Sequence, residues 1–226
     1  MAEQLSFDLP VRRALGREDF FVSPANALAV TLIDTPQTWI APKLVLYGPQ
    51  GSGKTHLAHV WATAMDGKVV AAADLPNADL PALIQTPLAI EDVPDIRSND
   101  AAQTALFHLH NMTQAERQPL LLTGRAEPGQ WDLPLPDLQS RMAGTQAVAL
   151  SPPDDALLTA VLAKLFADRQ IVPRRDVIPY LIAHMDRSFE MAARIVTALD
   201  LAALRESRSL SRPLAAQELA RMMDQP

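Results

Sequence analysis

Short runs of apolar residues recur along the first two thirds of the chain, and each is bounded by proline, glycine or aspartate. Runs of this length and composition are typical of buried β-strands. The predicted strands are 43–47, 69–72, 87–90, 119–123 and 147–150.

Helical periodicity fills the stretches between these runs. The clearest case is 99–111, whose apolar residues share one helical face: Ala102, Ala105, Leu106 and Leu109. Strands that alternate with helices form a parallel sheet with helices on both of its sides. The sequence therefore predicts an α/β core on a five-stranded parallel sheet.

The pattern changes after residue 150. Residues 151–154 read Ser-Pro-Pro-Asp, which predicts a hinge and then a helix that begins at the N-cap Asp154. Further helices are expected from near Asp176, from Ser188 and after Pro213. The helix that begins after Asp154 has an apolar face made of Leu157, Leu158, Val161, Leu162 and Leu165. A small all-helical lid is the natural interpretation.

Composition and charge narrow the functional classes. The 226 residues are 48% apolar and 20% charged, with a net charge of −6, so no general attraction to nucleic acid or anionic membrane is expected. Cysteine is absent, which excludes disulfides and thiolate chemistry. The N-terminus lacks the features of a signal peptide and no apolar run approaches the ~18 residues of a membrane span. We therefore expect a cytoplasmic protein with no membrane association.

Residues 48–55 match the phosphate-binding pattern G-x-x-x-x-G-K-[ST] in full. A predicted strand leads into the motif and a helical pattern leads out of it, which argues against a glycine-rich turn that matches by chance. In this pattern backbone N–H groups cradle phosphate oxygens, Lys54 neutralises the β- and γ-phosphates, and the Thr55 hydroxyl ligates Mg²⁺. The predicted contacts with ADP or ATP are Gly48, Gly51, Ser52, Gly53, Lys54, Thr55 and His56.

Two carboxylates, Glu91 and Asp92, follow the predicted strand 87–90. Hydrolysis at a P-loop needs a carboxylate here to hold Mg²⁺ through water, and many P-loop ATPases of this type carry Asp and then Glu, the second to orient the attacking water. We expect Glu91 to assist Mg²⁺ and Asp92 to fall short of the water, so that the isolated chain hydrolyses slowly. The alternative is that these residues only begin a solvated acidic loop.

With these residues in place, the chain resembles the DnaA-like AAA+ family along nearly its whole length. It is most similar to the short Hda-type members, which inactivate the replication initiator DnaA. The resemblance implies that residues 19–27 wrap the adenine, with Val22 among the contacts. It also implies that 121–125 is the sensor 1 strand, with Thr123 probing the γ-phosphate or its attacking water.

The stretch 135–142 resembles the family segment that carries an arginine finger, which would be Arg141. The alternative is that Arg141 only caps its own helix C-terminus, where a cation is also favourable. The family's sensor 2 arginine falls at Glu190 in this chain, which leaves Arg194 or Arg187 as candidates to reach the phosphates.

The resemblance extends to the N-terminus, where Gln4, Leu5, Phe7 and Leu9 look like a sliding-clamp-binding motif. Gln4 would fix the register and the apolar residues would supply buried area. The alternative is that this segment packs on the chain's own core.

The expected organisation is a clamp-binding tail (1–15), an AAA+ α/β nucleotide-binding core (16–150) and a helical lid (151–226). The expected function is Hda-like: the chain would bind ADP or ATP with Mg²⁺ and the sliding clamp, and promote ATP hydrolysis on DnaA. Sequence-specific DNA binding is not expected, since no helix-turn-helix domain follows the lid. The rival interpretations are a self-sufficient ATPase and a helicase loader or adaptor, and pairing of two copies stays open.

Overall fold

The structure, a computed structural model, describes residues 21–206 and 209–223. Its centre is a five-stranded sheet in which every pair of neighbouring strands is parallel, in the order β2-β3-β4-β1-β5. The strands are β1 (Lys43–Tyr47), β2 (Lys68–Ala71), β3 (Leu88–Glu91), β4 (Leu120–Gly124) and β5 (Ala147–Ala149). The predicted five-stranded parallel sheet is therefore confirmed, with strand ends that differ by at most one residue.

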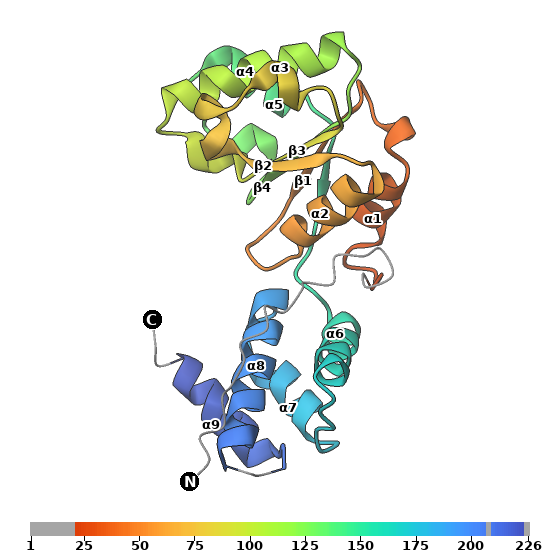
Figure 1. The fold of residues 1–226 in the computed structure, drawn as a ribbon, viewed down its shortest axis with the longest axis vertical. Helices are drawn as coiled ribbons and strands as arrows, with labels where there is room; N and C mark the ends of the chain where they lie inside the picture. The colour runs from red at the N-terminus through yellow and green to blue at the C-terminus, as the bar shows by residue number, and fades with distance from the viewer. Residues whose placement is uncertain (1–20, 207–208, 224–226) are drawn as a thin grey trace, which may run out of the picture.

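The alternation of side chains along the strands separates two cores. Leu44 and Leu46 of β1 pack with α1 (Ala27–Asp34) and α2 (Lys54–Ala64) on one face of the sheet. Val45 points to the other face. That face is covered by η3 (Ala72–Asn77), α3 (Leu80–Leu83), η4 (Val93–Ile96), α4 (Asp100–Ala115) and α5 (Pro136–Ala143). Two short turns, η2 (Pro36–Thr38) and η5 (Pro128–Gln130), complete the core, and Figure 1 shows the sheet between the two helical layers.

The predicted burial of all five strands is wrong for the two at the edges. β2 is only partly buried and β5 is buried only at Val148, whereas β1, β3 and β4 are almost fully buried. The reason is topological, because β2 pairs only with β3 and β5 pairs only with β1. Nucleotide-binding loops follow the buried central strands, so this correction does not move the predicted site.

Helix α4 begins where the sequence predicts and ends later. The Asn99 side chain accepts a hydrogen bond from the backbone N–H of Ala102 at 3.0 Å, which caps the helix. All four residues of the predicted apolar face are buried. The helix continues to Ala115, and its last turns bury His110 at 4% exposure.

Beyond β5 the chain forms only helices: α6 (Asp155–Asp168), α7 (Val177–His184), α8 (Phe189–Glu206) and α9 (Arg212–Met223). Asp154 caps α6 by accepting a hydrogen bond from the Leu157 N–H at 2.8 Å. The four helices share a core of their own, which includes Phe166 in addition to the predicted Leu158 and Leu162 of α6, with Val161 and Leu165 packed against it. Figure 1 shows this bundle beyond one end of the α/β core, joined to it by the chain after β5. The fold is thus an α/β core followed by an all-helical lid.

None of the helices within 21–206 and 209–223 is both long enough and apolar enough to cross a membrane.

Candidate functional site

The predicted phosphate loop lies at the carboxyl end of β1, the strand between β4 and β5. Gly48, its first residue, donates its N–H to the carbonyl of Gly124 at 3.2 Å, which ties the loop to the end of β4. The loop then turns into α2, whose first residue is Lys54. Strand, glycine-rich loop and helix therefore have the arrangement in which backbone N–H groups and a helix N-terminus bind phosphate.

The glycines of this loop are required by its geometry. Gly51 and Gly53 have φ of +75° and +97°, in the left-handed region that side chains disfavour. A Cβ on Gly51 would lie 2.2 Å from the Cβ of Ser188, and one on Gly53 would lie 2.8 Å from the ring of Phe189. The loop is therefore held directly against the first turn of the lid helix α8.

A hydrogen bond makes the same connection between loop and lid. The backbone N–H of Phe189 donates to the carbonyl of Gly51 at 3.2 Å. Neither Ser188 nor Phe189 was identified from the sequence, because nothing in the local pattern tells which lid residues reach a loop more than 130 positions earlier.

Lys54 is folded into its own loop. Its ammonium donates to the carbonyl oxygens of Gly48 and Pro49, both at 2.8 Å, and the residue is 8% exposed. Burial lowers the pKa of Lys54, and the nearby carboxylate of Asp92 opposes this shift. An ammonium held in this way is already dehydrated and positioned at the bottom of the loop.

Two buried polar atoms at the site lack partners within the described residues. They are the hydroxyl of Ser52, in a residue 2% exposed, and the Oε1 atom of Glu91. Buried polar atoms are normally paired, and unpaired ones are found where a ligand, ion or water completes the bonding. These two atoms fit a bound nucleotide phosphate with its Mg²⁺, and Thr55 is exposed in the first turn of α2.

The two acidic residues at the end of β3 differ in their surroundings. Glu91 is largely buried, and its Oε2 lies 4.0 Å from Nε2 of His59. Asp92 is exposed and has φ of +54°, and its backbone N–H donates to the hydroxyl of Thr123 at 3.0 Å. Thr123 is 1% exposed on β4. The structure thus brings Glu91, Asp92 and Thr123 together at the carboxyl ends of β3 and β4, the same end of the sheet as the phosphate loop.

The predicted adenine segment is described from residue 21 onward. Asn26 organises it: the Asn26 side chain accepts from the Ser23 N–H at 2.8 Å and donates to the Phe21 carbonyl at 2.9 Å. Val22 is 53% exposed in this turn. The carbonyl of Ala25 accepts from the N–H of Ser151 at 3.3 Å, which places the segment beside the hinge that leads to the lid.

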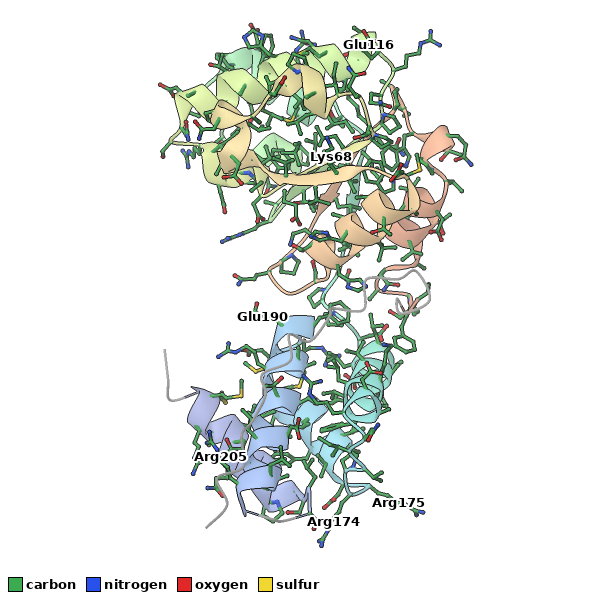
Figure 2. All side chains as sticks on the ribbon, in the orientation of Figure 1. Lys68, Glu116, Arg174, Arg175, Glu190 and Arg205 are labelled. Atoms are coloured by element: carbon green, nitrogen blue, oxygen red, sulfur yellow. The ribbon has the colours of Figure 1, made fainter. Side chains whose placement is uncertain are left out.

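The sensor 2 candidates border a cavity of about 350 Å³ between the loop and the lid. Its lining includes Gln50, Gly51, Arg187, Ser188, Glu190 and Arg194. Figure 2 shows Glu190 at the end of α8 that faces the core. Arg187 is engaged elsewhere, because it donates to Asp155 and to the carbonyl of Pro153. Arg194 is exposed on the next turn of α8, which makes it the better-placed cation.

Arg141 lies far from all of these residues. It is exposed in the last turn of α5, with its guanidinium carbon 5.1 Å from the ring centroid of Phe107. Burial, and after it the charge of Arg141, lowers the pKa of Lys43, the first residue of β1. Five residues of extended strand separate Lys43 from Gly48, about 16 Å at ~3.3 Å per residue. Arg141 therefore lies near the amino ends of the parallel strands, at the end of the sheet opposite the phosphate loop of its own chain.

The candidate clamp-binding residues Gln4, Leu5, Phe7 and Leu9 lie outside the described residues.

Comparison with known proteins identifies the fold. No protein-family model matches the sequence. Domain III of the Thermotoga maritima replication initiation protein DnaA superposes with a TM-score of 0.77 at 19% identity, over 94% of this chain and 98% of that one. AMPPCP-bound DnaA from Aquifex aeolicus gives 0.69 at 19% identity, over 83% and 65%. A single-residue variant of Thermotoga maritima RuvB gives 0.67 at 17% identity, over 90% and 70%.

The chain has a DnaA-like AAA+ fold. In this chain the cavity between the phosphate loop and the lid is lined by Gln50 and Gly51 of the loop and by Arg194 of α8. The described residues contain no group of three or more His, Cys, Asp or Glu side chains that could hold a metal ion.

Proposed function

We propose that this AAA+ chain binds ADP or ATP with Mg²⁺ at its phosphate loop. The backbone N–H groups of 51–55 and the ammonium of Lys54 hold the phosphates. The Thr55 hydroxyl and Glu91 hold Mg²⁺, which neutralises charge on the phosphate oxygens. The unpartnered buried atoms of Ser52 and Glu91 support this assignment. Val22 and His56 complete the nucleotide contacts, and Arg194 approaches the phosphates from the lid.

We further propose an Hda-like regulatory role, in which Arg141 completes the nucleotide site of a neighbouring molecule. The observation that carries this role is the placement of Arg141, which is exposed at the edge of the sheet opposite its own phosphate loop. An arginine supplied by a neighbour spreads the charge of a transferring phosphoryl group and accelerates hydrolysis by about 10³–10⁵. The neighbour is ATP-bound DnaA, and hydrolysis there would prevent renewed initiation.

The N-terminal motif would recruit the chain to the sliding clamp. Gln4 and the apolar residues Leu5, Phe7 and Leu9 bind a groove of the sliding clamp, so that the chain acts where replication has begun. Sequence-specific recognition of DNA is no part of the role, and the net charge of −6 is in keeping with that.

The decisive experiment follows the loss of ATP from ATP-bound DnaA in the presence of DNA-loaded clamp and this chain. The wild-type chain should accelerate the loss, and the Arg141→Ala and Gln4→Ala chains should not. Arg97→Ala is the matched control, because Arg97 is also an exposed core arginine but lies 3.9 Å from Asp132 in an ion pair. Full activity of the Arg141→Ala chain would refute the regulatory proposal.

The second candidate is a self-sufficient ATPase that uses Asp92 to orient water and Thr123 to probe the γ-phosphate. It is favoured by the meeting of Glu91, Asp92 and Thr123 at the loop edge. Brisk hydrolysis by the purified chain without partners, abolished by Lys54→Ala, would select it. A helicase loader or adaptor would instead bind single-stranded DNA, and self-pairing through Arg141 would appear as a dimer by sedimentation.

A further inference from the structure

The guanidinium of Arg141 rests on one aromatic ring. Its Cζ lies 5.1 Å from the ring centroid of Phe107, which is half-buried on α4 beside α5. A cation over the face of an aromatic ring is attracted by the ring quadrupole. This contact orients the guanidinium and consumes none of its N–H donors.

The hydrogen-bond acceptors near Arg141 are taken by another cation. The ammonium of Lys43, a residue 3% exposed, lies 3.0 and 3.3 Å from the two ring nitrogens of His110. The same ammonium donates to the His110 carbonyl and to Oε1 of Gln114, both at 3.1 Å. Lys43 therefore occupies the acceptors that this part of α4 would otherwise offer to an arginine.

No carboxylate of the described residues lies within 4.0 Å of the Arg141 guanidinium, and Asp137, one turn earlier on α5, makes no ion pair with it. Two other exposed core arginines do pair with a carboxylate: Arg97 lies 3.9 Å from Asp132 and Arg125 lies 3.7 Å from Asp95. In the described part of the chain, the Arg141 guanidinium makes neither an ion pair nor a hydrogen bond. Its donors are consequently available to an anion from another molecule.

We propose that Phe107 and Lys43 are positioning residues for Arg141, which together hold its guanidinium outward and unpaired for a phosphoryl oxyanion on a neighbouring molecule. Phe107 fixes the guanidinium by its ring face, and Lys43 removes the intramolecular acceptors into which Arg141 would otherwise fold. The inference rests on the proposed role of Arg141. Such preorganisation lowers the cost of reaching the transition state, because the cation need not be freed or reoriented during hydrolysis.

The first test is kinetic and uses the full chain with DNA-loaded clamp and ATP-bound DnaA. Phe107→Leu should lower the maximal stimulated rate about two- to fivefold, the factor that corresponds to one exposed cation–π contact. The chain concentration at half-maximal stimulation should stay unchanged, and Phe107→Tyr should restore the rate. Tyr180→Leu is the matched control, because Tyr180 lies under Arg212 at 5.2 Å in the lid, in the same kind of contact.

Lys43→Met tests the second half of the proposal in the same assay. It frees the acceptors on α4, so Arg141 can fold inward and the maximal rate should fall, again without a change in half-maximal concentration. A Lys43→Met chain with the wild-type maximal rate would overturn the role given to Lys43.

A second measurement needs no partner. Burial, followed by the charge of Arg141, lowers the pKa of Lys43 to about 8. NMR titration of the Lys43 side chain should therefore report where Arg141 lies. Arg141→Gln should raise the pKa of Lys43, and Phe107→Leu should raise it part of the way, because the guanidinium leaves its place. Tyr180→Leu should leave it unchanged.

The two measurements separate the possible failures. If Arg141→Ala stimulates as well as the wild type, the proposed function fails, and the titration still decides whether Phe107 positions Arg141. If Arg141→Ala is inert while Phe107→Leu keeps both the wild-type rate and the wild-type pKa of Lys43, the proposed function stands and the positioning role is overturned. A thermal unfolding midpoint for Phe107→Leu equal to that of Phe107→Tyr excludes misfolding as the cause of any loss.

Discussion

The backbone N–H of Asp92 donates to the hydroxyl of Thr123 at 3.0 Å, which ties the carboxyl ends of β3 and β4 together. The chain turns at Asp92, which has φ of +54°, and Oε2 of the preceding residue, Glu91, lies 4.0 Å from Nε2 of His59 on α2, the helix that follows the phosphate loop. Glu91 keeps one buried, unpartnered oxygen, whereas Asp92 is exposed. The two carboxylates should therefore contribute differently.

Glu91→Gln and Asp92→Asn test this difference. Glu91→Gln should raise the Mg²⁺ concentration needed for half-maximal ATP binding about tenfold or more, because a neutral amide replaces a buried carboxylate at the metal. Asp92→Asn should change this Mg²⁺ concentration less than threefold, as expected for an exposed charge. Calorimetric titration of ATP at several Mg²⁺ concentrations measures both, and equal effects would contradict the assignment of the metal to Glu91.

Lys54→Ala should abolish most nucleotide affinity. Its ammonium is already dehydrated and held by the loop carbonyls at 2.8 Å, so it contributes a charge-assisted contact with a phosphate. A loss of about 2–4 kcal/mol, or roughly 30- to 1,000-fold in affinity for ATP, is expected from contacts of this kind. Lys68→Ala, which changes an exposed lysine on the edge strand β2 (Figure 2), should bind ATP normally. Similar affinities for the two variants would place the nucleotide elsewhere.

The sequence was sufficient for the fold and for the local parts of the site. The run of apolar strands, the glycine-rich motif and the caps Asn99 and Asp154 are encoded by neighbouring residues, and the structure has the expected sheet, lid and helix starts. The shallow burial of β2 was missed because strand order is set by long-range pairing.

The same limit applies to contacts between distant segments. The packing of Phe189 on Gly53 and the Lys43–His110 contact join residues 136 and 67 positions apart. No local pattern encodes such a pair, because each residue alone fits an ordinary helix or strand. The placement of Arg141 relative to its own loop likewise follows from the sheet topology and could not be read from the motif around it.

Gly51→Ala should disturb both stability and binding. The new Cβ would lie 2.2 Å from the Cβ of Ser188 in a residue with φ of +75°. The left-handed backbone alone costs about 1–2 kcal/mol, and the contact forces the lid away from the loop. Urea unfolding should show a loss of at least this size, and ATP affinity should fall. Gly129→Ala is the control, since a Cβ there meets nothing within 4 Å, and it should leave both quantities nearly unchanged. If both variants behave alike, the loop does not depend on its contact with α8.

His110 should make the stability of the protein depend on pH below neutrality. Burial, then the charges of Lys43 and Arg141, lower the pKa of His110 to about 4, while a hydrogen bond with Asn111 on the same helix opposes the shift. The unfolded chain, with a pKa near 6.5, binds a proton between pH 6.5 and 4 that the folded chain does not. The unfolding free energy should therefore fall as pH is lowered through this window, by on the order of 3 kcal/mol in total from this residue.

Urea unfolding at pH 6.5, 5.5 and 4.5 measures the slope of the unfolding free energy against pH. His110→Gln should flatten it, whereas His108→Gln, at an exposed position two residues earlier on α4, should keep the wild-type slope. A wild-type slope in the His110→Gln chain would mean that other groups account for the acid sensitivity and that His110 is not held neutral by the cations around it.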